Sequence, residues 1–302
     1  MAKSLLTLVQ DAANEMGLTS PATVVGNTDN EIIQMYSLIN RVGDSLMASY
    51  DWQRLNTEYR FTTSAVSVTG DTTNGSAVVT GLSDTTGIAA GYLASGLGIQ
   101  ADTHVVSVDS STQVTLDATC QSSNTAATLA FGEDKYSLPS DWDRQINRTD
   151  WDKTKRWELM GPKLPQEWQW LKSGIISTGP RLRYRIYGNY YQIWPVPDNG
   201  SRLGFEYISN KWALSSGGTA QASFLADTDT CVFPDRLMTL GLKLKFFEVK
   251  GFDTTAMAND FNKAYEAACA NDAGSPTLSL APSISSILLT PLNIPDSGYG
   301  SS

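Results

Sequence analysis

Paired carboxylates are the first feature of this sequence that could do chemistry. Two Asp-Trp-Asp units lie nine residues apart, at residues 141–143 and 150–152, in a stretch rich in tryptophan. A glycosidase uses two acids in this way, but one carboxyl group needs a raised pKa in an apolar pocket. Each of these aspartates has a basic neighbour, which lowers a carboxyl pKa. We therefore expect them to cap helices or form turns, and we keep a peptidoglycan-degrading enzyme as the alternative.

Other residue types that could hold a metal or a cofactor are sparse. His104, the only histidine, lies in an apolar alternation typical of a strand face, and the three cysteines are far apart without CxxC or CxxH spacing. The GxGxxA match at residues 96–101 is followed by a strand-like run instead of the helix that a pyrophosphate needs. We predict no metal, no cofactor and no catalytic residue.

A basic and aromatic stretch is the strongest candidate for binding a partner. Residues 135–185 hold eleven of the 22 basic residues against six acids, interleaved with five tryptophans. Such mixing occurs in single-strand nucleic-acid binding and in protein interfaces, where Trp and Arg are enriched anchors. We favour an interface, with a nucleic-acid-binding protein as the second alternative. The predicted contacts are Trp142, Arg144, Arg148, Trp151, Lys155, Arg156, Trp157, Trp168 and Trp170.

The overall composition supports a protein partner rather than bulk binding to nucleic acid. The chain has 302 residues, about two domains, with 41% hydrophobic residues and a net charge of −9. A negative protein does not hold phosphate by electrostatics alone. No run of 18 apolar residues and no signal-peptide core occurs. We expect a cytosolic product without membrane contact.

One segment differs sharply from the rest. Residues 62–131 contain 24 Ser or Thr and five Asp, but no Lys, Arg, Trp or Pro. Short alternating runs separated by turns such as Asn74-Gly75 predict a small β-sandwich or barrel. The break in composition indicates an inserted all-β domain, 62–131, within a discontinuous host of residues 1–61 and 132–273.

The host is predicted to be α+β, a helical bundle core with a small antiparallel β-meander. Two helices are predicted before the insert: Gly17 ends the first, and Asp29 caps the start of the second. Two more are predicted after it: Pro234 opens the first of these, and Asp253 caps the start of the second. Strand candidates at residues 181–187, 190–194 and 203–209, separated by turn formers, would build the meander.

The last segment, residues 274–302, is predicted to be an extended C-terminal arm. It has four prolines, no base and one acid, yet keeps eight large aliphatic residues. Proline excludes a regular helix, and the apolar content suits a segment that lies in a groove or adds to a sheet edge. The predicted docking residues are Leu278, Leu280, Ile284, Ile287, Leu288, Leu289, Leu292 and Ile294.

The order of these features resembles one family. After the first helix pair come a Tyr136-Ser137-Leu138-Pro139-Ser140 run, a strand pair around Gly188-Asn189 and a helix opened by Phe233-Pro234-Asp235-Arg236. This order resembles the head-to-tail adaptor (head completion or connector) proteins of short-tailed bacteriophages. Residues 70–117 are similar to small β-modules of phage tail and structural proteins.

The resemblance implies a non-enzymatic virion protein that forms a ring, expected to be a dodecamer, between the portal and the tail nozzle or tail tube protein. DNA would pass through the ring as non-specific cargo, and the inserted domain would dock a tail fibre or spike. The arm would bind the portal or an adjacent subunit. The protein would occupy the host cytoplasm during assembly and then the head-tail junction of the virion.

Overall fold

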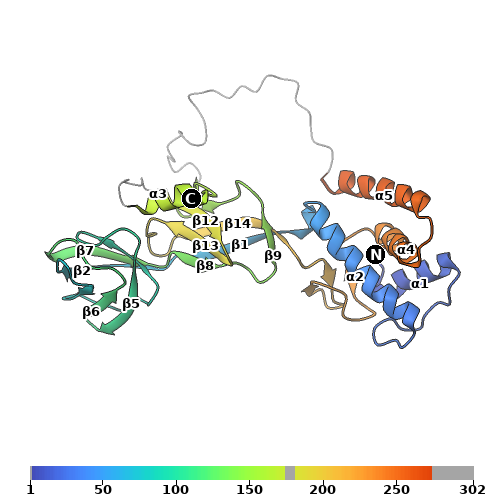
Figure 1. Cartoon of the computed structure of the whole chain (residues 1–302), viewed down its shortest axis with the longest axis horizontal. Coiled ribbons are helices and arrows are strands. Elements are labelled where there is room, and N and C mark those ends of the chain that lie inside the picture. Colours follow the sequence, from blue (N-terminus) through green and yellow to red (C-terminus); the bar gives the residue numbers. More distant parts are fainter. Residues whose placement is uncertain (1, 174–180, 274–302) are drawn as a thin grey trace, which may run out of the picture. The chain divides into compact units, whose positions relative to one another are not determined.

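The structure, a computed structural model, describes residues 2–173 and 181–273 (Figure 1). These residues form two compact units. The first comprises residues 2–57, 141–145 and 207–273, and the second comprises residues 58–140, 146–173 and 181–206. Both units are therefore discontinuous in sequence.

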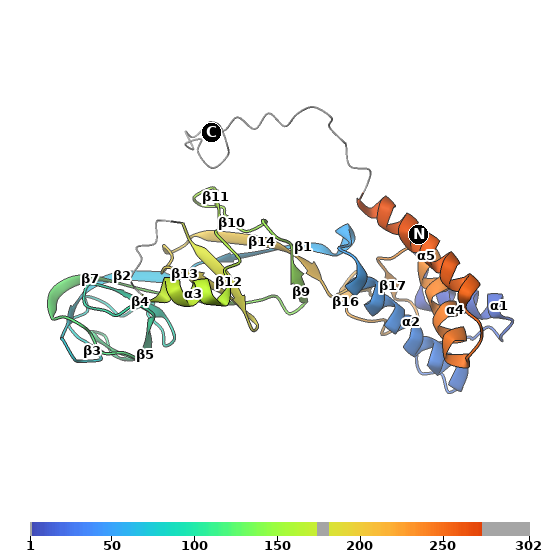
Figure 2. The ribbon, with the colours of Figure 1, turned by 45° about the horizontal axis from the view of Figure 1, so that its top comes forward.

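The described part of the first unit contains four α-helices, and one of them lies at the centre and contacts the other three. The four helices are α1 (Leu5–Met16), α2 (Asn30–Ser49), α4 (Asp235–Lys250) and α5 (Thr255–Ala273). Helix α4 packs against the other three, as Figures 1 and 2 show. The predicted caps are confirmed, because Gly17 ends α1 with φ +72° and the Asp29 side chain accepts the Glu31 N–H at the start of α2.

Aromatic rings fill the core beside these helices. Trp212 is fully buried, with its ring 5.0 Å from that of Phe224 and 6.0 Å from that of Phe233. A 3₁₀ turn, Gln53–Leu55, follows α2. A small sheet in the order β16-β15-β17 completes the unit, with β15 (Ala213–Leu214), β16 (Ala220–Gln221) and β17 (Thr230–Cys231).

The predicted all-β segment forms a six-stranded antiparallel sheet in the second unit. Its order is β2-β7-β4-β5-β6-β3, with β2 (Ala65–Thr72), β3 (Val78–Val79), β4 (Leu93–Gly96), β5 (Thr103–Ser110), β6 (Gln113–Leu116) and β7 (Asn124–Gly132). All twelve buried residues of its apolar core, from Val68 to Phe131, come from residues 62–131. The strands of the described residues form no closed barrel, so the barrel alternative is not found.

The remaining strands differ from the predicted meander. Strands β12 (Arg183–Tyr187) and β13 (Tyr190–Trp194) do form the expected hairpin, but the next neighbour of β13 is β8 (Lys135–Ser137). Strand β14 (Arg202–Ser209) instead joins β1 (Asn56–Thr62), β9 (Trp142–Gln145), β10 (Trp151–Asp152) and β11 (Trp157–Glu158). The meander was wrong because strand pairing depends on long-range packing that local alternation does not encode.

The fold is thus α+β, with five helices among the described residues. The fifth, α3 (Pro165–Lys172), was not predicted. Its start has Pro165 at the first helical position, and the Glu167 side chain accepts the Leu164 N–H. No helix among the described residues has the length and apolar character needed to span a bilayer.

Candidate interaction surface

The four aspartates that could have formed a catalytic pair are used in structural contacts. Asp141 accepts hydrogen bonds from the Tyr207 and Ser209 hydroxyls at 2.9 and 2.7 Å. Partial burial would raise the pKa of Asp141, but these hydrogen bonds outweigh it and leave the pKa below its usual value. A general acid needs the opposite shift.

Both aspartates of the second Asp-Trp-Asp unit, Asp150 and Asp152, are buried. Asp150 accepts the Tyr184 and Tyr191 hydroxyls at 2.6 and 2.8 Å, and burial together with the Asp150 charge raises the pKa of the Tyr191 hydroxyl. Asp152 accepts the backbone N–H groups of Thr154 and Lys155, both at 2.9 Å. The predicted role of turn former is therefore confirmed for Asp152.

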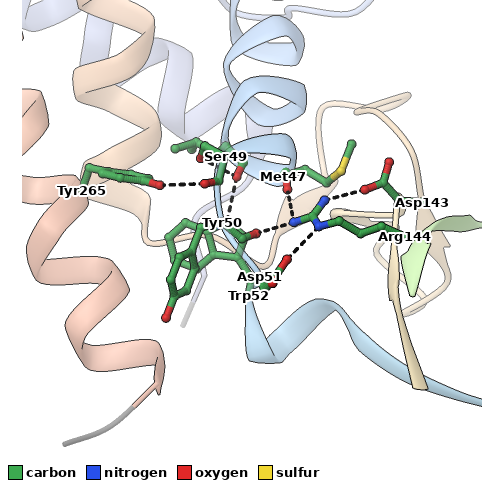
Figure 3. A network of polar contacts seen from close by, with 9 residues as sticks. Met47, Ser49, Tyr50, Asp51, Trp52, Asp143, Arg144 and Tyr265 are labelled. Atoms are coloured by element: carbon green, nitrogen blue, oxygen red, sulfur yellow. Dashed lines mark hydrogen bonds and ion pairs between the residues drawn. The ribbon is translucent and has the colours of Figure 1, made fainter. Parts of the chain in front are cut away.

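Arg144, a predicted contact residue, makes its hydrogen bonds within its own unit. Its guanidinium donates to Asp51 Oδ1 at 2.7 Å and to Asp143 Oδ2 at 2.5 Å (Figure 3). It also donates to the carbonyl oxygen of Tyr50 at 2.8 Å, and that of Met47 lies 3.3 Å away. These carbonyls lie at the C-terminal end of α2, where helical carbonyls lack intrahelical donors. Arg144 thus caps α2 from strand β9.

Strands β10 and β11 and the turn between them hold four of the predicted contact residues, Trp151, Lys155, Arg156 and Trp157. Trp151 is 42% exposed, whereas Trp157 is half-buried. Lys155 Nζ lies 5.6 Å, and Arg181 Cζ 5.7 Å, from the centre of the Trp157 ring. The attraction between a cation and an indole ring is stronger when a partner excludes water from the contact.

The two tryptophans of helix α3 differ in their exposure to solvent. Trp168 is 2% exposed and belongs to the core, whereas Trp170 is 59% exposed. Lys172 Nζ lies 5.9 Å from the rings of both Trp168 and Trp194 and pairs with Asp102 Oδ1 at 2.5 Å. Of the two tryptophans, only Trp170 is accessible to a partner.

The predicted contacts do not all lie in one unit. Trp142 and Arg144 belong to the first, and the other seven to the second, where Arg148 and Arg156 are exposed. The tip of the β12–β13 hairpin was not among the predicted contacts, although Tyr187 and Tyr190 there are 59% and 47% exposed. Arg185 lies 4.9 Å from the Tyr187 ring. Two tyrosines flanking Gly188-Asn189 were the signal that could have identified this tip.

His104 lies between two aspartates, which its position in the predicted strand did not indicate. Its Nε2 lies 3.5 Å from Oδ2 of Asp134, and its Nδ1 lies 3.7 Å from Oδ2 of Asp117. Asp134 is 1% exposed, and neither of its carboxylate oxygens accepts a hydrogen bond from the described residues. Burial, with the nearby Asp134 charge, raises the pKa of Glu133. The group lies at the end of β7, where residues 62–131 join the rest of the unit.

Within residues 2–173 and 181–273, no three His, Cys, Asp or Glu side chains gather as metal ligands would. Cys120 and Cys231 are buried and unbridged, and burial raises the pKa of both thiols, to about 12 for Cys231. The predicted arm residues, from Leu278 to Ile294, lie outside the described residues.

Comparison with protein families gives a match over residues 111–280, more than half of the chain, to the family described as SU10 adaptor protein. The chain belongs to the SU10 adaptor protein family. The resemblance to phage adaptors is thereby confirmed, and the protein is a bacteriophage structural protein. All nine predicted contact residues of this adaptor, and the start of its arm, fall within the matched span. Comparison with curated proteins found no match.

Proposed function

We propose that this adaptor forms a ring, of twelve copies, that joins the portal of the virion to the tail nozzle or tail tube protein. DNA would pass through the ring as non-specific cargo. Family membership supports the adaptor role, and the exposed aromatic and basic side chains of the second unit support a protein interface. The single observation that carries the proposal is this concentration of accessible anchors, Trp151, Trp170, Tyr187 and Tyr190, within one unit.

Charge supports a head-to-tail contact between copies. The first unit has sixteen acidic against ten basic side chains, while residues 135–185 have eleven basic against six acidic ones. A ring needs two different patches on each subunit that meet. The basic stretch of one copy would face the acidic first unit of the next, and the acidic surplus elsewhere would repel DNA phosphate in the channel.

Residues 62–131 are proposed to be an inserted domain that docks a tail fibre or spike. Their apolar core is self-contained, and their composition differs from that of the rest of the chain. The arm, residues 274–302, is proposed to bind the portal or an adjacent subunit. Twelve arms acting together would make weak single contacts strong.

The two alternatives have less support. The Asp141 pKa is lowered and Asp150 and Asp152 are held in buried structural contacts, which disfavours a peptidoglycan-degrading enzyme. Several lysines are already paired with acids, among them Lys153 with Glu58, Lys155 with Asp198 and Lys172 with Asp102. This leaves fewer cations for nucleic-acid phosphate.

Purified adaptor mixed with its cognate portal provides the test. We expect a ring on the portal, seen by electron microscopy and by co-sedimentation. Trp170→Ala combined with Tyr187→Ala should weaken this association at least tenfold, because large exposed anchors are lost. Leu97→Ala is the matched control, since Leu97 is 65% exposed but lies in residues 62–131. No ring under gentle conditions, or equal loss in the control, would contradict the proposal.

A further inference from the structure

An apolar groove lies on the surface of the first unit between α2, α4 and α5. Its volume is about 380 Å³, and its lining includes Val42, Leu46, Leu244, Lys245, Phe261 and Tyr265. Figure 2 shows the three helices side by side. They approach closely at the floor, because a Cβ on Gly241 would lie 2.6 Å from Val42 Cγ1 and 3.1 Å from Phe261 Cε2.

Helix α5 is only partly covered by the rest of its unit. Of its described side chains, Ala268 alone is buried, although Met257, Phe261, Ala264 and Tyr265 form an apolar stripe. The rings of Phe261 and Tyr265 lie 6.4 Å apart and roughly parallel. A surface helix usually buries such a stripe. The stripe and the groove beside it therefore form a site for an apolar segment.

The chain itself supplies such a segment directly after α5. Residues 274–302 contain eight large aliphatic residues, no base and a single acid. From Phe261 to Ala273 the helix rises about 18 Å, and the residues from Ala273 to Leu280 span up to about 24 Å when extended. The arm is therefore long enough to turn back along α5 and bring Leu278 and Leu280 to the groove.

We propose that in the free adaptor the arm of each chain occupies this groove of the same chain. A segment tethered a few residues away acts at a high effective concentration, which favours its own groove over that of another copy. Docking would also cover an apolar segment that invites aggregation when exposed. This inference rests on the proposed role of the arm as an assembly contact, because the portal or a neighbouring subunit would have to displace the arm from the groove.

Hydrogen exchange of the full-length free adaptor, without portal, tests this docking. Leu278→Asp with Leu280→Asp should speed amide exchange around Phe261–Tyr265 at least tenfold. Ser297→Asp with Ser301→Asp adds the same charge outside the apolar run and should leave exchange unchanged. Equal exchange in the wild type and the leucine variant would overturn the proposal. So would protection that grows with protein concentration, because the occupant would then be a second copy.

A groove variant gives an independent measurement. Ser45 is exposed and lines the groove, so Ser45→Trp should fill it without disturbing the core. Protease cleavage within residues 274–302 should then become at least fivefold faster. Ser37→Trp, on an exposed position of α2 outside the groove lining, is the control. Equal cleavage rates in both variants would contradict the docking. Since no portal is present, this result is separate from any failure to form a ring.

Discussion

At the scale of single residues, side chains that a sequence marks as partner contacts can serve the fold instead. Arg144 and the four aspartates of the Asp-Trp-Asp units all have intramolecular partners at hydrogen-bond distance. Removing one side of such a contact leaves the other without a partner, which is more damaging than the bond is stabilising. Substitutions at these positions should therefore report on stability before they report on assembly.

Arg144→Ala should lower the free energy of unfolding by about 2 kcal/mol, because the carbonyls at the end of α2 lose a charged donor. Arg144→Lys should recover only part of this, since an ammonium lacks the planar fork of the guanidinium. Urea denaturation of the purified protein measures both. Arg148→Ala is the control, because Arg148 is exposed. Equal destabilisation by the Arg144 and Arg148 substitutions to alanine would contradict the capping role.

Glu58 gives a pH-dependent contribution to stability. Hydrogen bonds from Arg60 and Lys153 lower the pKa of its carboxyl from 4.5 to about 2. The lowered value in the folded state means that the contribution is present above pH 4.5 and is lost as the pH falls towards 2. Glu58→Gln should therefore be less stable than the wild type at pH 7, by up to about 1 kcal/mol for exposed pairs. Thermal unfolding measured from pH 7 down to pH 2 should show the unfolding temperatures of the wild type and of Glu58→Gln converging.

At the scale of elements, helix α2 depends on one small residue. A Cβ on Gly43 would lie 2.3 Å from the buried indole of Trp212, whose Nε1 donates to Asp44 Oδ1 at 3.0 Å. Glycine normally weakens a helix interior by about 1 kcal/mol relative to alanine. Here the close packing of Trp212 on α2 requires it.

Gly43→Ala should therefore destabilise the protein by about 2 kcal/mol, despite the better helix propensity of alanine, because the buried indole has to shift. Ser37→Ala, at an exposed position of the same helix, should be neutral or slightly stabilising. Circular dichroism during thermal unfolding distinguishes them. A Gly43→Ala protein as stable as Ser37→Ala would show that the contact between Trp212 and α2 is loose.

At the scale of the whole molecule, residues 62–131 and the arm can each be removed at a defined point. Ala65 and Gly132 are paired at the end of the β2–β7 ladder, so their Cα atoms are about 5 Å apart and an Asn-Gly turn can join them. Replacing residues 66–131 by such a turn removes Asp102, the partner of Lys172, and His104, the neighbour of Asp134. Some loss of stability in the second unit is expected.

Replacement of residues 66–131 by that turn should leave assembly on the portal intact while docking of a fibre or spike is lost, because the exposed anchors lie elsewhere in the second unit. Electron microscopy of portal complexes checks both. Absence of the ring in a variant that is folded by circular dichroism would contradict the proposed role of this segment.

A chain ending at Ala273 should keep its helical circular dichroism, because all five described helices are retained. Its co-sedimentation with portal should fall at least tenfold, since the avidity of the arms is lost. Undiminished association would show that the arm is not an assembly contact.

The sequence by itself determined the local features of this protein. Helices α1, α2, α4 and α5 followed from apolar periodicity and from caps such as Gly17 and Asp29, and the β12–β13 hairpin followed from its turn residues. These features depend on interactions between residues close in the chain, which a sequence displays directly. The change in composition at residues 62–131 likewise indicated the all-β segment.

Only the tertiary structure decided which candidates are accessible and which strands pair. Trp168 is buried and Trp170 exposed because residues two apart on a helix point to different sides, and helix α3 itself was not predicted. Strand β14 pairs with β9 and β10 instead of β13, and Arg144 lies at the end of α2, 94 positions from Tyr50. Such contacts depend on which segments distant in sequence pack together on folding, and the periodicity of residues along the chain does not specify this.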